Sequence, residues 1–111
     1  MKLENDKRIE PRSPILRNHR AEIKLVGEPI YQFKVADVSD QGAGLVVPKT
    51  SAFLKLIEVD QEMGVTFISP RGSEPNGVYK VKVRHITDLD HSRYKGVLLI
   101  GVRILERMTT E

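Results

Sequence analysis

The sequence predicts an all-β fold of six strands, either a barrel or a sandwich, with an extended N-terminal arm and at most one short helix. Three features lead to this expectation. Apolar and polar residues alternate in short runs, turn-forming residues separate these runs, and only one segment has helical spacing. With 111 residues, the chain is long enough for one domain with one modest hydrophobic core. A closed barrel also pairs every strand edge, which a small open sheet would leave exposed to aggregation.

The first 20 residues are expected to form an arm outside the barrel. They contain almost no core-forming residues, and Pro11 and Pro14 favour extended backbone in the residues before them. The excess positive charge behind the net charge of +3 lies here, because residues 21–111 contain equal numbers of basic and acidic side chains. Such a basic arm indicates either an anionic partner or a solvated tail. We therefore divide the chain into an arm, residues 1–20, and a barrel, residues 21–111.

The barrel is expected to begin at Ala21 with two strands joined by a turn over residues 27–29. The apolar positions that alternate with polar ones in these two strands are Ile23, Leu25, Tyr31, Phe33 and Val35. The polar segment Asp37–Gly42 then leads into a third strand over Leu45–Val47, which Pro48 ends.

One short helix of about two turns is expected over Ser51–Ile57, with Ser51 near its start. Three further strands are expected over Met63–Ile68, Val78–Ile86 and Tyr94–Leu105. Turn residues over 70–77 and a polar loop over 88–92 separate these strands.

No residue pattern in the sequence is typical of an enzyme. The chain has no cysteine, so a thiol nucleophile, a disulfide and a thiolate metal site are excluded. The histidines His19, His85 and His91 have no ligand-like spacing, and no glycine-rich phosphate loop precedes a helix. We therefore expect a non-enzymatic protein without a metal site or cofactor.

The sequence also predicts a cytoplasmic protein that does not insert into a membrane. Its first ten residues are charged and lack the apolar stretch of a signal peptide. The longest apolar run, Val97–Ile100, is too short to span a bilayer. The lack of cysteine agrees with an intracellular compartment.

Two short motifs have the residue types needed to bind a ligand. The arm contains an RxxxR element from Arg8 to Arg12, and a DxSxxG element runs from Asp37 to Gly42. Each has a simpler explanation by itself, because arginines in an arm are commonly solvated and Asp, Ser and Gly favour turns for local reasons. Together, in this order and within a six-strand pattern, they resemble the PilZ domain, in which the paired motifs form a site for cyclic di-GMP.

The resemblance extends from about Lys7 to Leu105 and implies a six-stranded antiparallel PilZ-like barrel that binds this bacterial second messenger. Such a protein is a signalling receptor or adaptor that acts on a downstream protein partner. The residues implied to contact or shape the ligand site are Arg8, Arg12, Asp37, Ser39 and Gly42, with Lys7 as a further candidate for a phosphate contact. Residues 13–20 separate the arginine motif from the first strand more widely than is usual in the family, so Arg17 and Arg20 are open candidates for the same site.

The chemistry of cyclic di-GMP fits these residue types. Guanine offers O6 and N7 to a guanidinium fork, and phosphate accepts the same fork in a way that lysine cannot reproduce. A carboxylate such as Asp37 complements the N1–H and N2–H donors of guanine or orients an arginine. Ser39 is expected on the same side of a strand as Asp37. Gly42 is expected to adopt a turn geometry that other residues resist and to let a ligand approach the backbone.

Signal relay is expected to involve the arm. Residues 1–20 have few apolar anchors, so without ligand they are expected to be mobile. Binding would then order the arm against the barrel and create a surface that a partner protein could recognise.

Two alternatives belong to other functional classes. A small basic barrel could bind nucleic acid through the arm and through Lys80, Lys82 and Arg84, but the three tyrosines are too scattered to form a stacking platform, so we do not favour it. A PilZ-like domain could also serve as a protein-interaction module that binds no nucleotide, which the intact motifs argue against.

Overall fold

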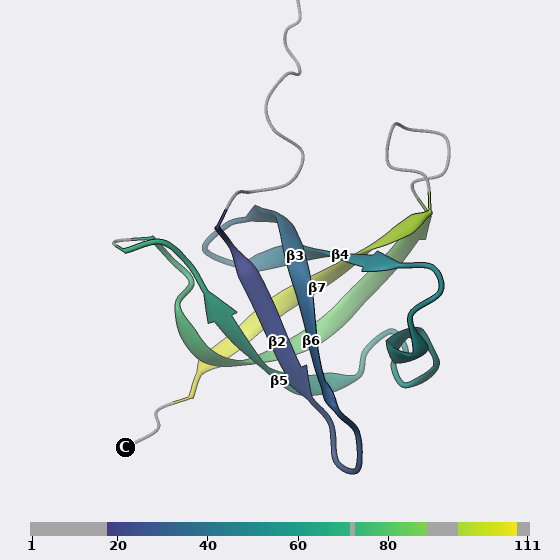
Figure 1. Ribbon diagram of the computed structural model, residues 1–111. Coiled ribbons are helices and arrows are strands. Elements are labelled where there is room, and N and C mark those ends of the chain that lie inside the picture. The colour runs from purple at the N-terminus through teal and green to yellow at the C-terminus, as the bar shows by residue number, and fades with distance from the viewer. Residues whose placement is uncertain (1–17, 72, 89–95, 109–111) are drawn as a thin grey trace, which may run out of the picture.

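The computed structural model describes residues 18–71, 73–88 and 96–108, and these form a closed antiparallel β-barrel of six strands (Figure 1). The strands are β2 (Arg20–Lys24), β3 (Ile30–Val38), β4 (Gly42–Pro48), β5 (Glu62–Ile68), β6 (Gly77–Asp88) and β7 (Val97–Arg107). Their order around the barrel is β2-β3-β4-β7-β6-β5, and pairing of β2 with β5 closes it. The predicted all-β barrel is thus confirmed.

The strand boundaries differ from the predicted ones at a few positions. Strand β2 begins at Arg20, inside the segment assigned to the arm. Strand β7 begins at Val97 rather than Tyr94, because Gly96 has a left-handed φ of 84° and forms a turn before it; Tyr94 itself lies outside the described residues. Strand β6 runs to Asp88 and pairs with β7 over nearly its whole length.

The predicted helix is a single 3-10 turn, η1 (Ala52–Lys55), instead of about two helical turns. Ser51 caps it, since its hydroxyl accepts a hydrogen bond from the Phe53 backbone N–H at 3.2 Å. The Phe53 side chain is fully buried against the rings of Tyr31 and Phe33, with centroid distances of 5.3 and 4.9 Å. This one aromatic anchor holds the turn against the barrel, and no longer helix is needed.

The core consists of the inward-facing apolar residues of all six strands. The fully buried side chains include Ile23, Val35, Leu45, Val47, Val65, Val81, Val83 and Ile100. Within the described residues, no polar or charged side chain is buried. Polar side chains therefore lie on the outer face or at the barrel ends, where a ligand could reach them. No helix in the described part of the chain is long and apolar enough to cross a membrane.

Candidate functional site

A pocket with a volume of about 380 Å³ lies on the outer face of the barrel, over β3, β4, β6 and β7. This volume is in the range of sites for small ligands. Its lining residues come from the β3–β4 hairpin (Asp37, Ser39, Gln41, Gly42, Ala43 and Gly44), from β6 (Arg84 and His85) and from β7 (Leu99, Gly101, Val102 and Arg103). The whole predicted DxSxxG set, Asp37, Ser39 and Gly42, is therefore brought together in one place.

Two glycines on adjacent strands, Gly44 on β4 and Gly101 on β7, form the floor of the pocket. Asp37 lies opposite Gly44, Gly44 lies opposite Gly101, and Gly101 lies opposite His85. Directly opposed residues of antiparallel strands point to the same face of a sheet. The row therefore places two positions without side chains between a carboxylate and an imidazole, which lets the Asp37 carboxylate lie over Gly44 and the His85 ring over Gly101.

Two β-bulges turn these flanking side chains outward. Val35 and Val83 point into the core, so strict alternation would also point Asp37 and His85 inward. The register shifts between Val35 and Asp37, and again between Val83 and His85, which leaves one extra residue in each strand. An extra residue reverses the alternation that follows it. Asp37 and His85 are accordingly exposed on the outer face.

The hairpin turn between β3 and β4 is held by hydrogen bonds of its own. The Ser39 hydroxyl accepts from the Gln41 backbone N–H at 3.2 Å, and the Ser39 N–H donates to the Gly42 carbonyl at 2.8 Å. The Ile104 N–H donates to the Gln41 carbonyl at 2.8 Å, which attaches the turn to β7. Ser39 thus has a local structural role, and its hydroxyl proton stays available to donate to a ligand.

Gly42 has a structural role that the sequence did not predict. It does not have a left-handed φ, so the expected turn geometry special to glycine is wrong. Instead, a Cβ at this position would overlap the carbonyl oxygen of Val102 on β7 and lie 3.4 Å from the Cα of Arg103. Glycine allows β4 and β7 to approach closely beside the pocket.

The opposite side of the pocket carries three nitrogen-rich side chains that the motifs did not assign. Arg84 is the extra residue of the β6 bulge, and Arg103 lies on β7 opposite Gly42; both are exposed. The His85 ring lies over Gly101, where a Cβ would be only 2.6 Å from its Cε1, and its Nδ1 is 3.0 Å from the Thr87 hydroxyl. The sequence indicated Arg84 only as part of a basic stripe with lysines of β6. The convergence of these three side chains depends on strand register, for which the sequence carries no clear signal.

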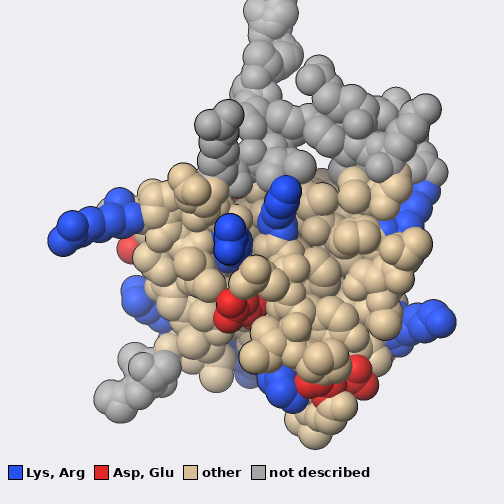
Figure 2. Space-filling view, viewed as in Figure 1, with Lys and Arg blue, Asp and Glu red and all other residues tan. Residues whose placement is uncertain are grey.

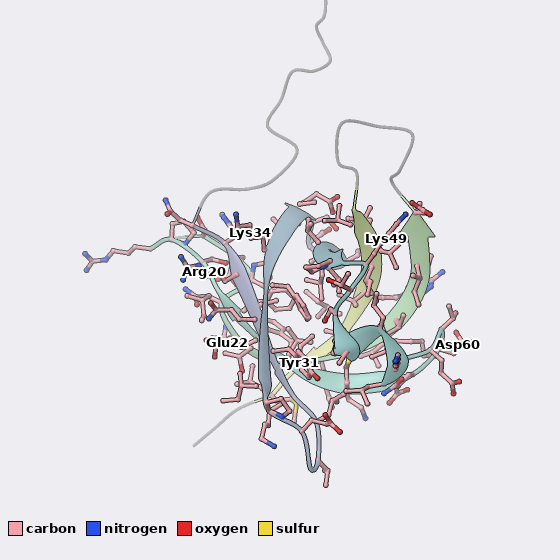
Figure 3. All side chains as sticks on the ribbon, turned by 45° about the vertical axis from the view of Figure 1, so that its right-hand side comes forward. Arg20, Glu22, Tyr31, Lys34, Lys49 and Asp60 are labelled. Atoms are coloured by element: carbon pink, nitrogen blue, oxygen red, sulfur yellow. The ribbon has the colours of Figure 1, made fainter. Side chains whose placement is uncertain are left out.

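The arginine motif itself is not placed, since Lys7, Arg8, Arg12 and Arg17 lie outside the described residues. The structure does describe Arg20, where the chain enters the barrel. Arg20 begins β2 opposite Lys34, and β3 continues beyond Lys34 to the pocket (Figure 3). The start of β2 and the β3–β4 turn lie at the same end of the barrel (Figure 1). The arm therefore joins the barrel at the end that carries the DxSxxG residues.

Comparison with protein-family models gives no match, and neither curated proteins nor solved structures match the chain. The case for a functional site is therefore made from the geometry of the pocket residues. Among the described residues, no group of three or more histidine, aspartate or glutamate side chains is placed to hold a metal ion.

Proposed function

We propose that this chain is a PilZ-like receptor or adaptor that binds cyclic di-GMP and relays the signal through its N-terminal arm. The observation that supports this function best is the pocket beside the β3–β4 turn. Asp37, Ser39 and Gly42 line it together with arginines from two other strands, although the motif alone gave no reason to expect those arginines there. A pocket that combines one carboxylate with several cationic groups suits a ligand that has both guanine and phosphate.

Each motif residue has a role in this proposal. The Asp37 carboxylate accepts hydrogen bonds from guanine N–H donors, and the Ser39 hydroxyl donates to the ligand. Arg8 and Arg12, carried by the arm, supply guanidinium forks for phosphate and for the O6 and N7 atoms of guanine. Lys7 adds a phosphate contact. Because the arm enters at the pocket end of the barrel, a short connection suffices to bring these side chains to the ligand.

Relay follows from where the ligand is bound. A ligand held jointly by the arm and the barrel orders the arm against the outer face of β3, β4 and β7, and a downstream protein recognises this new surface. Ordering the arm costs conformational entropy, so the affinity is lower than the number of contacts alone would give. Hydrogen exchange with and without cyclic di-GMP tests this step. Protection should increase at residues 7–20 and 37–42 while β5 changes little; an arm equally protected in both states would refute the relay.

The described surface gives little support to nucleic-acid binding. Lys80, the first residue of the predicted basic stripe on β6, forms an ion pair with Glu62 at 3.3 Å, which offsets part of the positive charge of that stripe. On the face with β2 and β3 in front, basic side chains are spread out with acidic ones among them (Figure 2). A strand-tracking nucleic-acid site requires a continuous positive groove, commonly with stacking aromatics.

Calorimetric titration of the full chain with cyclic di-GMP tests the proposed function, with GTP and single-stranded DNA as competing ligands. Specific binding of cyclic di-GMP is expected. Since a bidentate arginine–guanine contact contributes about 1–3 kcal/mol, Arg8→Ala or Arg12→Ala should weaken binding roughly 10- to 100-fold. Lys80→Ala is the matched control and should change little. Absence of binding by folded protein, or an equal response to all three ligands, would reject cyclic di-GMP as the ligand.

A further inference from the structure

The pocket has opposite chemistry on its two sides. On the β3 side stands the carboxylate of Asp37, the one acidic group among the described lining residues. Arg84, His85 and Arg103 stand on the β6–β7 side. Gly44 and Gly101 lie between the two sides, with the Asp37 carboxylate over Gly44 and the His85 ring over Gly101.

We propose that this polarity fixes the orientation of the ligand, with Arg84 and Arg103 binding a phosphate group and Asp37 binding the edge of a guanine. The inference depends on the proposed function and deepens it, because it assigns phosphate recognition to the barrel as well as to the arm. The His85 ring lies over Gly101, between the two arginines and the floor of the pocket, and positions the arginines.

Both arginines are free to take this role. Within the described residues, neither Arg84 nor Arg103 has an acidic partner, whereas Lys80 on the same strand is paired with Glu62. Arg103 lies opposite Gly42, so no side chain on β4 covers it from that side. Two exposed guanidinium groups that converge on one hollow repel each other, and a bound phosphate relieves this repulsion while accepting their planar forks.

The bulge at Arg84 brings the His85 imidazole to the outer face beside this arginine. On β6, Lys82 lies directly opposite Arg103 and on the same outer face. Arg84 continues the outward row of Lys80 and Lys82, and without the extra residue it would lie opposite Gly101 in the place of His85. The bulge instead places Arg84 and His85 side by side at the pocket, and Lys82 stays outside its lining.

The test is calorimetry of cyclic di-GMP with full-length Arg84→Ala, Arg103→Ala, Asp37→Asn and Lys82→Ala variants. Lys82→Ala is the matched control, because it removes a cation next to Arg103 that does not line the pocket. Each arginine variant should weaken binding roughly 10- to 100-fold, and Arg→Lys should restore only part of the loss. All four side chains are partly or fully exposed, and far-ultraviolet circular dichroism should confirm that the variants fold.

Two further measurements separate phosphate contacts from base contacts. Salt screens arginine–phosphate attraction, so Arg84→Ala and Arg103→Ala should flatten the fall in affinity between low and high salt. Competition by cyclic di-AMP measures base preference, which Asp37→Asn should lower and the arginine variants should leave unchanged.

The possible failures are distinguishable. If wild-type protein does not bind cyclic di-GMP, the proposed function fails and this inference fails with it. If the wild type binds but the arginine variants behave like Lys82→Ala, only the inference fails. If the arginine variants lose base preference and keep the wild-type salt dependence, they contact the base, and the proposed orientation is overturned.

Discussion

Replacing Gly42 by alanine separates the structural role of the DxSxxG glycine from a role in ligand binding. The added methyl group would meet only backbone of β7: it would overlap the Val102 carbonyl oxygen, and the Val102 carbonyl carbon would be 3.3 Å away. Backbone in the middle of a paired strand cannot rotate away as a side chain can, so the strands must separate locally.

The expected cost combines two opposing effects. Overpacking typically costs about 1–3 kcal/mol, while replacing glycine by alanine in a compatible conformation stabilises by about 0.4–1 kcal/mol through the unfolded chain. We therefore expect Gly42→Ala to lower the free energy of unfolding by about 1–2 kcal/mol. For a domain of this size, that corresponds to a melting temperature lower by roughly 5–15 °C.

Gly64→Ala is the matched control. Gly64 lies within β5, and a Cβ there would meet nothing within 4 Å. Its replacement should leave stability unchanged or raise it by up to about 1 kcal/mol. Urea unfolding followed by circular dichroism measures both variants. If Gly42→Ala unfolds at the same urea concentration as Gly64→Ala, the close approach of β4 and β7 does not explain the glycine. A fully stable Gly42→Ala protein that failed to bind cyclic di-GMP would instead assign Gly42 to the ligand.

Three other substitutions test the packing around the site and in the core. Gly101→Ala should destabilise the wild type less than Gly42→Ala does, because the added methyl group meets the exposed His85 ring, which can rotate away. A double-mutant cycle in urea should show the remaining cost disappearing in a His85→Ala background. Additive effects would mean that the ring does not lie over Gly101. Leu45→Ala should lower the free energy of unfolding by about 2–5 kcal/mol, because this side chain is fully buried. Val26→Ala, at a fully exposed position, should change the free energy of unfolding by no more than about 0.5 kcal/mol. Similar values for the two variants would contradict the assigned core. Ser51→Ala removes the cap of η1 and should cost about 1 kcal/mol in thermal unfolding, and an unchanged melting temperature would show that Phe53 alone anchors the turn.

Strand content and most of the core were predictable from residue patterns alone. Alternation of apolar residues depends only on the two-residue period of a strand, so runs such as Tyr31–Val35 could be assigned before any tertiary contact was known. Residues 37–42 were likewise recognisable as a connection and as a motif, because turn residues act through local backbone preferences. The length of η1 was overestimated, since its end depends on how Phe53 packs among rings from other elements.

The position of the site and the residues that complete it depend on how the strands pair. Pairing of β4 with β7 joins strands far apart in the sequence and opposes Gly44 to Gly101. The two bulges then reverse side-chain direction within β3 and β6, which alternation read along one strand cannot reveal. A bulge exists because a strand must match the register of its neighbour, so the outward direction of Asp37 and His85 is a property of strand pairs rather than of local sequence.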